Sequence, residues 1–265
     1  MVFKKRNLSQ VFLKNRRYIH RIIDAIDITG KNVFEVGPGE GIITEALAEK
    51  AHHLWALDID ERFVKLLNDK FHQTKNISII RNNILCFDLE TLPEKLVLFS
   101  NVPYHISTEF IEYLIHYHHR IEKAYLLLQK EFVDKLTASV GNRQYGFLTC
   151  VSAYYSEVKV LFSVPRRAFL PVPSVHSKFI CMDFSKKTLF DPAEEKKFVQ
   201  LLRLCFSCPR KTLFNGLRPV YPQDGLISAF ECVDVSRVMR PHQISLQKYH
   251  QLMQEIQLID SGNRK

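Results

Sequence analysis

The chain has 265 residues, and 46% of them are hydrophobic, which is enough for one large core or for one core with a small appended domain. Its apolar runs are too short to cross a bilayer, and its basic N-terminus lacks the apolar segment of a secretory signal, so we expect a cytoplasmic protein that does not enter membranes. The formal net charge of +9 suits either a polyanionic partner, such as a nucleic acid, or an ordinary solvated basic surface.

The first two-thirds of the chain alternates predicted strands with predicted helices. Short apolar or β-branched runs predict strands at residues 31–37, 53–60, 76–83, 96–101 and 124–129. Amphipathic runs predict helices at residues 40–51, 61–71 and 107–119, and a further helix from Lys130. The long runs 147–164 and 174–184 are rich in β-branched and aromatic residues, which predicts late, antiparallel strands. This order predicts a Rossmann-like, doubly wound, mainly parallel sheet of seven strands.

The pattern changes near residue 185, so we predict a first domain over 1–184 and a second over 185–265. Residues 193–207, 210–217, 224–230 and 245–258 have helical spacing, which predicts a small all-helical C-terminal domain. Cys205 and Cys208 in this domain resemble half of a zinc site, but no second pair follows at a ligand spacing. We therefore predict reduced cysteines and no metal.

The first predicted strand leads into Glu35-Val-Gly37-Pro-Gly39-Glu-Gly41 and then into a helix. Such glycines allow a tight turn and let a ligand lie against bare main chain, while the helix N-terminus offers free N–H groups. Asp58 ends the next strand, about 20 residues after the loop, where an acid can bind ribose hydroxyls. The spacing differs from the G-x-G-x-x-G of dinucleotide sites. The combination favours S-adenosylmethionine over a turn that binds no ligand.

Asn101-Val-Pro103-Tyr104 follows another predicted strand, at the edge of the sheet where ligands bind. An Asn oxygen and a backbone carbonyl, before or at the proline, can accept the two N–H bonds of an aromatic amine. These bonds would free the nitrogen lone pair for attack on a sulfonium methyl group. We predict Asn101 and the Pro103 carbonyl as the acceptors and Tyr104 as the surface that stacks on the base. The alternative is a proline turn with an amide cap.

These motifs resemble those of the rRNA adenine N6-dimethyltransferase family, which includes the small-subunit rRNA dimethyladenosine transferases (KsgA) and the Erm methylases of large-subunit rRNA. The matching segments are LSQVFL at 8–13, EVGPGEG at 35–41, LDID at 57–60, NVPYHIST at 101–108, LLLQKEF at 126–132, QYGFL at 144–148 and VPRRAFLPVPSVHS at 164–177. Val102 is typical of the rRNA branch, since DNA adenine methylases more often have Asn-Pro-Pro-Tyr. The resemblance implies a class I S-adenosylmethionine-dependent methyltransferase fold and methylation of rRNA adenine.

The resemblance also implies roles for matching residues. The N-terminal segment would close over the cofactor, the glycine loop would line its methionine tail, and Phe169 would stack on the flipped base opposite Tyr104. The implied cofactor-binding residues are Gln10, Phe12, Leu13, Glu35, Gly37, Gly39, Gly41, Asp58, Ile59, Asn83, Ile84 and Asn101. The implied catalytic residues are Asn101, Pro103, Tyr104 and Phe169.

Asn83 and His105 depart from the family pattern. The family usually has Asp at the position of Asn83, where a carboxylate accepts a hydrogen bond from the adenine amine of the cofactor. An amide oxygen accepts without charge, so we expect weaker cofactor affinity, with Asn82 or Asp88 as alternative acceptors. His105 stands where the family often has Asn or Ser, and we predict no role in proton transfer for it. Asp58 also stands where Glu is usual.

The segments RKTLFNGL and RVMRPHQISLQKYHQL resemble the helical domain of the small-subunit enzymes. This implies dimethylation of two adjacent adenosines in the 3′-terminal hairpin loop of 16S rRNA, in the immature 30S subunit, by a monomer. Arg210, Lys211, Arg237 and Arg240 are candidates for phosphate contacts, with ordinary surface charge as the alternative. The rival functions are an Erm-like 23S rRNA methyltransferase that confers macrolide resistance and a non-catalytic RNA-binding assembly or transcription factor.

Overall fold

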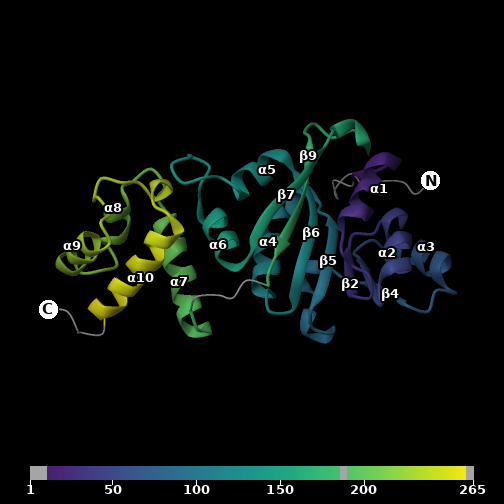
Figure 1. Ribbon diagram of the computed structural model, residues 1–265, viewed down its shortest axis with the longest axis horizontal. Coiled ribbons are helices and arrows are strands. Elements are labelled where there is room, and N and C mark those ends of the chain that lie inside the picture. The colour runs from purple at the N-terminus through teal and green to yellow at the C-terminus, as the bar shows by residue number, and fades with distance from the viewer. Residues whose placement is uncertain (1–10, 186–189, 261–265) are drawn as a thin grey trace. The chain divides into compact units, whose positions relative to one another are not determined.

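The computed structural model describes residues 11–185 and 190–260. They form two compact units, one of residues 11–133 and 156–185 and one of residues 134–155 and 190–260 (Figure 1). The sequence-based boundary at 184 leaves residues 134–155 in the first domain, whereas the structure packs this segment with the second unit.

The first unit is built on a seven-stranded sheet with the order β4-β3-β2-β5-β6-β9-β7. The strands are β2 (Asn32–Val36), β3 (His53–Asp58), β4 (Ile77–Arg81), β5 (Leu96–Asn101), β6 (Ile121–Gln129), β7 (Glu157–Val164) and β9 (Ser177–Asp183). Neighbours from β4 to β6 are parallel, and β9 runs antiparallel to β6 and β7. This confirms the predicted sheet. The strand order reverses between β2 and β5, because β3 and β4 lie on one side of β2 while β5 and β6 lie on the other. Ligands of open α/β sheets bind beyond the carboxyl ends of the strands at such a point.

Helices cover the sheet, with α1 and α2 on one side of the strands and α4 on the other (Figure 1). The helices of this part of the chain are α1 (Arg16–Ala25), α2 (Ile42–Lys50), α3 (Glu61–Phe71), α4 (Ser107–His116) and α5 (Lys130–Leu136). Polar side chains start two of them. Asn15 accepts a hydrogen bond from the Arg17 amide at 3.1 Å, and Asp60 accepts one from the Arg62 amide at 3.1 Å. Such N-caps satisfy amides that have no partner within the helix.

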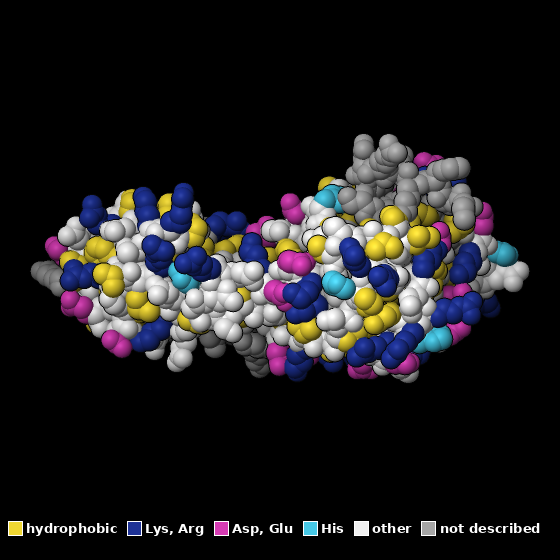
Figure 2. All heavy atoms as spheres, turned by 90° about the horizontal axis from the view of Figure 1, so that it is seen from above, with side chains coloured by type: hydrophobic (Ala, Val, Ile, Leu, Met, Phe, Trp, Pro, Cys, Tyr) yellow, Lys and Arg dark blue, Asp and Glu magenta, His cyan; other side chains and the backbone are white. Residues whose placement is uncertain are grey.

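The Lys and Arg side chains of this basic chain are spread over the face shown in Figure 2.

No helix in the described parts of the chain is long and apolar enough to pass through a bilayer. Within the same residues, no three His, Cys, Asp or Glu side chains come together as a metal site.

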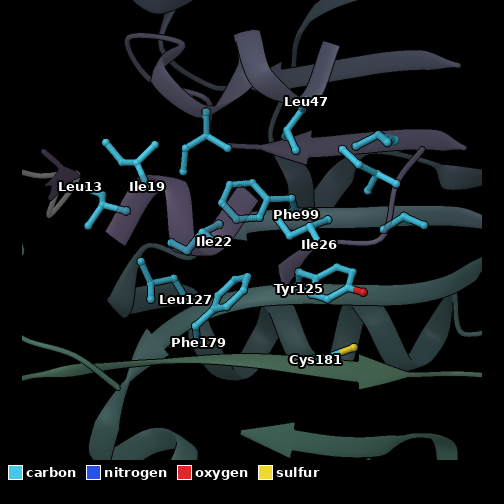
Figure 3. Packing of buried hydrophobic residues seen from close by; sticks show 14 of the residues in the cluster. Leu13, Ile19, Ile22, Ile26, Leu47, Phe99, Tyr125, Leu127, Phe179 and Cys181 are labelled. Atoms are coloured by element: carbon cyan, nitrogen blue, oxygen red, sulfur yellow. The ribbon is translucent and has the colours of Figure 1, made fainter. Parts of the chain in front are cut away.

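A core packed between α1, α2 and one face of the sheet holds the strands in place (Figure 3). Ile19 and Ile22 lie on one face of α1, Ile26 follows the helix directly, and all three are buried. Phe179 of β9 lies at the centre of an aromatic group, with its ring centroid 6.2 Å from that of Tyr125. This burial sets the strand positions and therefore where their carboxyl ends lie.

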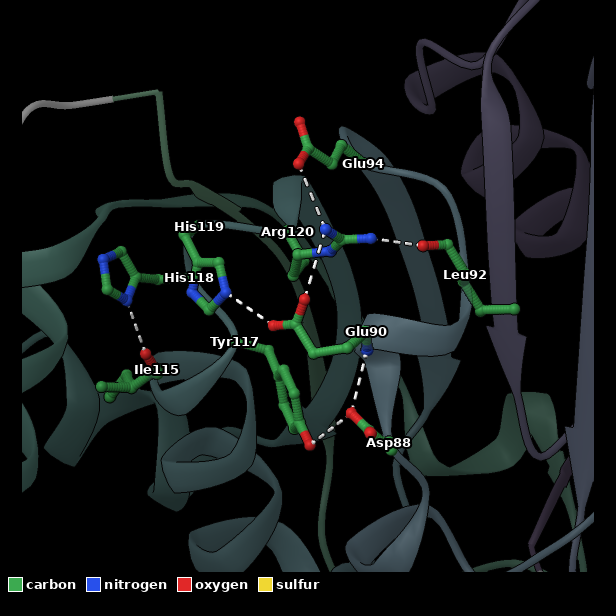
Figure 4. A network of polar contacts seen from close by, with 9 residues as sticks. All are labelled: Asp88, Glu90, Leu92, Glu94, Ile115, Tyr117, His118, His119 and Arg120. Atoms are coloured by element: carbon green, nitrogen blue, oxygen red, sulfur yellow. Dashed lines mark hydrogen bonds and ion pairs between the residues drawn. The ribbon is translucent and has the colours of Figure 1, made fainter.

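A polar network lies at the end of the sheet where β5 and β6 begin, opposite the carboxyl ends of these strands (Figure 4). The Arg120 side chain, only 12% exposed, pairs with Glu90 at 3.3 Å and with Glu94 at 3.2 Å, and it donates to the Leu92 carbonyl. Glu90 also lies 2.8 Å from a ring nitrogen of His119. These contacts tie the chain before β5 to the turn before β6.

The described residues of the second unit form helices and turns, as predicted. Its helices are α6 (Phe147–Tyr155), α7 (Pro192–Cys205), α8 (Leu213–Leu217), α9 (Gln223–Cys232) and α10 (Leu246–Asp260).

The predicted strand over 147–164 is wrong in its first half, because residues 147–155 form α6 and the strand β7 begins only at Glu157. Seven of the nine α6 residues are buried, and Tyr154 packs against Phe198 of α7 with ring centroids 5.1 Å apart. A helix that is buried over most of its surface shows no clear apolar stripe, so hydrophobic periodicity does not distinguish it from a buried strand.

Candidate active site

A cavity of about 230 Å³ lies at the carboxyl ends of β2, β3 and β5, where the strand order reverses. Its lining residues are Val11, Phe12, Val36, Gly37, Gly39, Leu57, Asp58, Ile59, Phe63, Asn82, Asn83, Ile84, Leu85, Asn101, Val102, Pro103, Tyr104, His105 and Ile106. Most of the site residues predicted from the sequence are therefore brought to one cavity, from loops that follow different strands.

The glycine loop between β2 and α2 turns through three left-handed positions, with φ of 72° at Gly37, 57° at Gly39 and 73° at Gly41. Gly37 and Gly39 line the cavity, and a Cβ at Gly37 would meet no atom within 4 Å. Gly41 does not line it, since a Cβ there would lie 2.6 Å from Leu67 Cδ2 on α3. Gly41, implied to line the methionine tail, instead lets α3 pack against the loop.

Asp58 at the end of β3 lies on the cavity wall and fixes the glycine loop. Its Oδ2 accepts a hydrogen bond from the Gly39 amide at 3.3 Å, and its Oδ1 accepts one from the Asp60 amide at 2.8 Å. Burial raises the pKa of Asp58, while these amide donors lower it. The carboxylate is thus held rigidly at the position expected for ribose recognition.

Glu35 lies beneath the glycine loop, off the cavity wall, with 2% of its surface exposed. Burial raises the pKa of Glu35 to about 8; the nearby Thr44 hydroxyl opposes this rise, and the Asp58 carboxylate adds to it. The carboxyl group is therefore mostly protonated at neutral pH. Thr44 is close to Glu35 but outside hydrogen-bond geometry, so its hydroxyl and Glu35 Oε2 are buried without a partner among the described residues.

Asn83 follows β4 and caps the short 3-10 turn Ile84–Cys86. Its Oδ1 accepts a hydrogen bond from the Leu85 amide at 3.1 Å, which leaves this oxygen a second lone pair for a ligand. Of the alternative acceptors, Asn82 also lines the cavity, and its Oδ1 accepts one hydrogen bond, from the Asn83 amide at 2.7 Å, so it too keeps a lone pair. Asp88 does not line the cavity.

Asn101 ends β5, and a contact from the N-terminal segment determines its orientation. Its Nδ2 donates to the Val11 carbonyl at 2.9 Å, across 90 residues of sequence. With the amide nitrogen engaged there, Oδ1 is the atom left as an acceptor on the cavity wall, and no described residue donates to it. The predicted acceptor is thus available.

The second predicted acceptor, the Pro103 carbonyl, already accepts a hydrogen bond from the Ile106 amide at 3.1 Å. No described residue donates to the Val102 carbonyl, although the Val102 amide is bonded to the Leu127 carbonyl at 3.1 Å. The geometry therefore favours the carbonyl before the proline over the carbonyl at the proline.

Tyr104 and His105 lie on the cavity wall within the 3-10 turn Tyr104–Ile106. The Tyr104 hydroxyl is 3.2 Å from Ser177 Oγ of β9, which holds the ring at the wall. Burial raises the pKa of Tyr104, so its phenol stays neutral. His105 is exposed, and no hydrogen bond or ion pair to a described residue gives it a chemical role.

Phe169 is not on the cavity wall and is only 2% exposed. It begins β8 (Phe169–Leu170), which pairs with β1 (Phe12–Leu13) so that Leu13 lies opposite Phe169. Leu13 is likewise in the core rather than on the wall. A stacking role for Phe169 therefore requires that its ring become uncovered.

Phe12 covers the glycine loop, since a Cβ at Gly39 would lie 2.9 Å from its ring. Its edge contacts Phe63 of α3, with ring centroids 5.7 Å apart. Gln10, the other implied residue of this segment, lies outside the described residues. Sequence reasoning missed Phe63 and the Val11 carbonyl, because a side-chain motif carries no signal for a backbone acceptor in a distant segment or for a ring on another helix.

The four candidate RNA-binding residues of the second unit are exposed, and none has a carboxylate partner among the described residues. Arg210 and Lys211 lie in the turn before α8, and Arg237 and Arg240 lie before α10. The Leu213 amide donates to the Met239 carbonyl at 2.8 Å, which joins these two segments. All four cationic side chains thus belong to two segments that are joined by one backbone hydrogen bond.

The model of the family described as ribosomal RNA adenine dimethylase matches residues 2–258. The chain belongs to this family. The ribosomal RNA small subunit methyltransferase A of Latilactobacillus sakei is 33% identical, over 94% of this chain and 88% of its own length. The protein of the same name from Koribacter versatilis is 33% identical, over 96% of this chain and 94% of its own.

Two solved structures of this fold match nearly the whole chain. The crystal structure of the 23S rRNA methyltransferase ErmE is 26% identical, with a TM-score of 0.75, over 93% of this chain and 99% of its own. A dimethyladenosine transferase from Plasmodium falciparum is 24% identical, with a TM-score of 0.83, over 95% of this chain and 98% of its own. Both support the methyltransferase fold.

Proposed function

We propose that the protein uses S-adenosylmethionine to dimethylate N6 of two adjacent adenosines in the 3′-terminal hairpin loop of 16S small-subunit rRNA. The observation that carries the proposal is the orientation of Asn101, whose amide nitrogen is held by the Val11 carbonyl so that its oxygen is free on the cavity wall. Membership of the ribosomal RNA adenine dimethylase family supports the reaction. Relatives with 33% identity that are named small subunit methyltransferase A favour this substrate over 23S rRNA.

The residues of the cavity suit S-adenosylmethionine. Gly37 presents bare main chain with open space in front of it, Asp58 presents a carboxylate for the ribose, and Asn83 keeps a lone pair for the adenine amine. The orphaned oxygen of Glu35 lies beneath the loop, and a cationic methionine tail bound at the loop would lower the raised pKa of this carboxyl and favour its ionised form. When bound, the cofactor supplies an electrophilic sulfonium methyl group.

The chain's own part in the reaction is to hold the target amine. Asn101 Oδ1 and the Val102 carbonyl would accept the two N–H bonds of the adenine amine, which turns its lone pair toward the methyl group. Tyr104, held by Ser177, would stack on the base. No general base is required, because the proton becomes acidic once the methyl group has been transferred.

The proposal extends to the setting of the reaction. The enzyme would act in the cytoplasm on the rRNA of immature 30S subunits. It would work as a monomer. Arg210, Lys211, Arg237 and Arg240 would contact phosphates through the second unit.

The test is transfer from labelled S-adenosylmethionine to undermethylated 30S subunits, followed by nucleoside analysis. Wild-type protein should form dimethyladenosine in the 3′ loop, whereas Asn101→Ala should bind cofactor in calorimetry but transfer at least about 100-fold more slowly, by analogy with loss of one preorganised hydrogen bond. Asn68→Ala, an exposed substitution on α3, is the matched control and should transfer normally. Full activity of Asn101→Ala, or label found in 23S rRNA instead, would overturn the proposal.

A further inference from the structure

Two segments of the first unit are basic and contain no acid. Residues 11–23 carry Lys14, Arg16, Arg17 and Arg21 without an Asp or Glu. Residues 158–182 carry Lys159, Arg166, Arg167 and Lys178, again without an acid. The two segments are more than 130 residues apart in the sequence, so only the fold decides whether their charges act together.

The fold joins them. The strand β1 pairs with β8, with Phe12 opposite Leu170. The Ala168 carbonyl accepts hydrogen bonds from the amides of Lys14 at 2.9 Å and Asn15 at 3.2 Å. Arg166 and Arg167 immediately precede this carbonyl, in a 3-10 turn, and Arg16 and Arg17 immediately follow Asn15. The four guanidinium groups therefore extend from backbone segments that are bonded to each other.

This junction borders the candidate active site. The segment that begins with Arg166 ends at Ser177, whose hydroxyl contacts the Tyr104 hydroxyl at 3.2 Å. At the other side, the Val11 carbonyl that orients Asn101 is three residues before Lys14. When one base of an RNA strand enters the cavity, the phosphates on either side of that base must lie over the residues that surround the cavity.

The charges of the junction are available. Arg16, Arg17, Arg166 and Arg167 are exposed, and within residues 11–185 and 190–260 none of them pairs with a carboxylate. The neighbouring cations are engaged, because Lys14 pairs with Glu40 and Arg21 lies over the Phe162 ring, 4.1 Å from its centroid. Leu170 and Val172 beside them are 59% and 53% exposed. Figure 2 shows Lys and Arg side chains interleaved with hydrophobic ones on this unit.

We infer that Arg16, Arg17, Arg166 and Arg167 form an RNA-binding rim on the catalytic unit, which holds the phosphates that flank the target adenosine. This inference rests on the proposed function for the identity of the RNA. Unpaired exposed arginines beside apolar side chains suit a single strand, whose phosphates take the charge while a neighbouring base covers Leu170 and Val172. The rim is separate from the cations proposed for the second unit.

The test compares two double variants of the full-length protein that remove the same charge. Arg166→Ala with Arg167→Ala removes half of the rim. Lys65→Ala with Lys159→Ala is the control, because both lysines are exposed and each already pairs with a glutamate, at 3.3 Å and 3.1 Å. Binding of a fluorescent unstructured 20-nucleotide RNA is titrated over a range of salt, and cofactor binding is measured by calorimetry.

The arginine variant should bind RNA more weakly, and its plot of log affinity against log salt should be less steep by about 1.4, since each lost phosphate contact removes about 0.7 on a single strand. The lysine control should keep the wild-type slope, and both should bind cofactor normally. On undermethylated 30S subunits the arginine variant should raise KM and leave kcat nearly unchanged.

Equal slopes for the two double variants would overturn the inference. So would a rim that binds anionic lipid vesicles or an acidic peptide more tightly than RNA. Failure of the proposed function would look different, because wild-type protein would then transfer no methyl group to 16S rRNA while the RNA-binding slopes still reported on the rim.

Discussion

Replacing Gly37 and Gly41 separately by alanine would separate ligand binding from packing within the glycine loop. The two glycines have nearly the same backbone conformation, with φ of 72° and 73°, so the strain of an alanine there is the same in both variants. Their surroundings differ, because a Cβ at Gly37 would meet nothing within 4 Å while a Cβ at Gly41 would lie 2.6 Å from Leu67 Cδ2.

The shared backbone strain is worth about 1–2 kcal/mol, and the lower entropy of the unfolded alanine chain offsets about 0.4–1 kcal/mol of it. Gly41→Ala adds overpacking against Leu67, which costs about 1–3 kcal/mol. Gly41→Ala should therefore unfold with a free energy about 1–3 kcal/mol lower than that of Gly37→Ala. Gly37→Ala instead puts a methyl group where the cofactor binds, and should weaken cofactor affinity about tenfold or more.

Urea unfolding of the cofactor-free variants measures the first effect, and calorimetry with S-adenosylmethionine measures the second. Gly41→Ala combined with Leu67→Ala provides a cycle, in which the double variant should lose less stability than the sum of the single variants. The reasoning is refuted if the two glycine variants are equally stable, or if Gly37→Ala binds the cofactor as wild type does.

Substitutions at three further positions test single side chains. Asn83→Asp should tighten cofactor binding about three- to tenfold in calorimetry, because a charged acceptor bonds more strongly than an amide, and unchanged affinity would contradict the assigned role. Tyr104→Phe should transfer methyl groups nearly normally because it keeps the ring and loses only the Ser177 contact, whereas Tyr104→Ala should lose most transfer; a large loss in both would argue against stacking. Glu35 holds its proton in the folded state up to a pH of about 8 but loses it near 4.5 when unfolded, so stability should fall as pH rises between these values, by up to about 1.4 kcal/mol per pH unit. Glu35→Gln should flatten this fall in denaturation at pH 5, 6.5 and 8, and an unchanged slope would show that Glu35 ionises normally.

Much of the site was predictable because its chemistry is local in sequence. Asp58 and Asn101 each end a strand, and Gly37 and Gly39 come just after one. Parallel strands bring their carboxyl ends to one edge, so strand order alone predicted that these residues meet. All four line the cavity. The helix α6 was not predictable from pattern, since seven of its nine residues are buried and its sequence is as suitable for a buried strand.

The sequence by itself predicted which side chains would carry the chemistry, and it determined the seven-stranded sheet and the edge of it at which the cavity lies. Tertiary structure alone decided which atoms of those residues are available. The Val11 carbonyl turns the Asn101 amide, and Leu67 fills the space beside Gly41. The physical reason is that hydrogen-bond acceptors and close contacts depend on distances between segments, which no local pattern of residue types specifies.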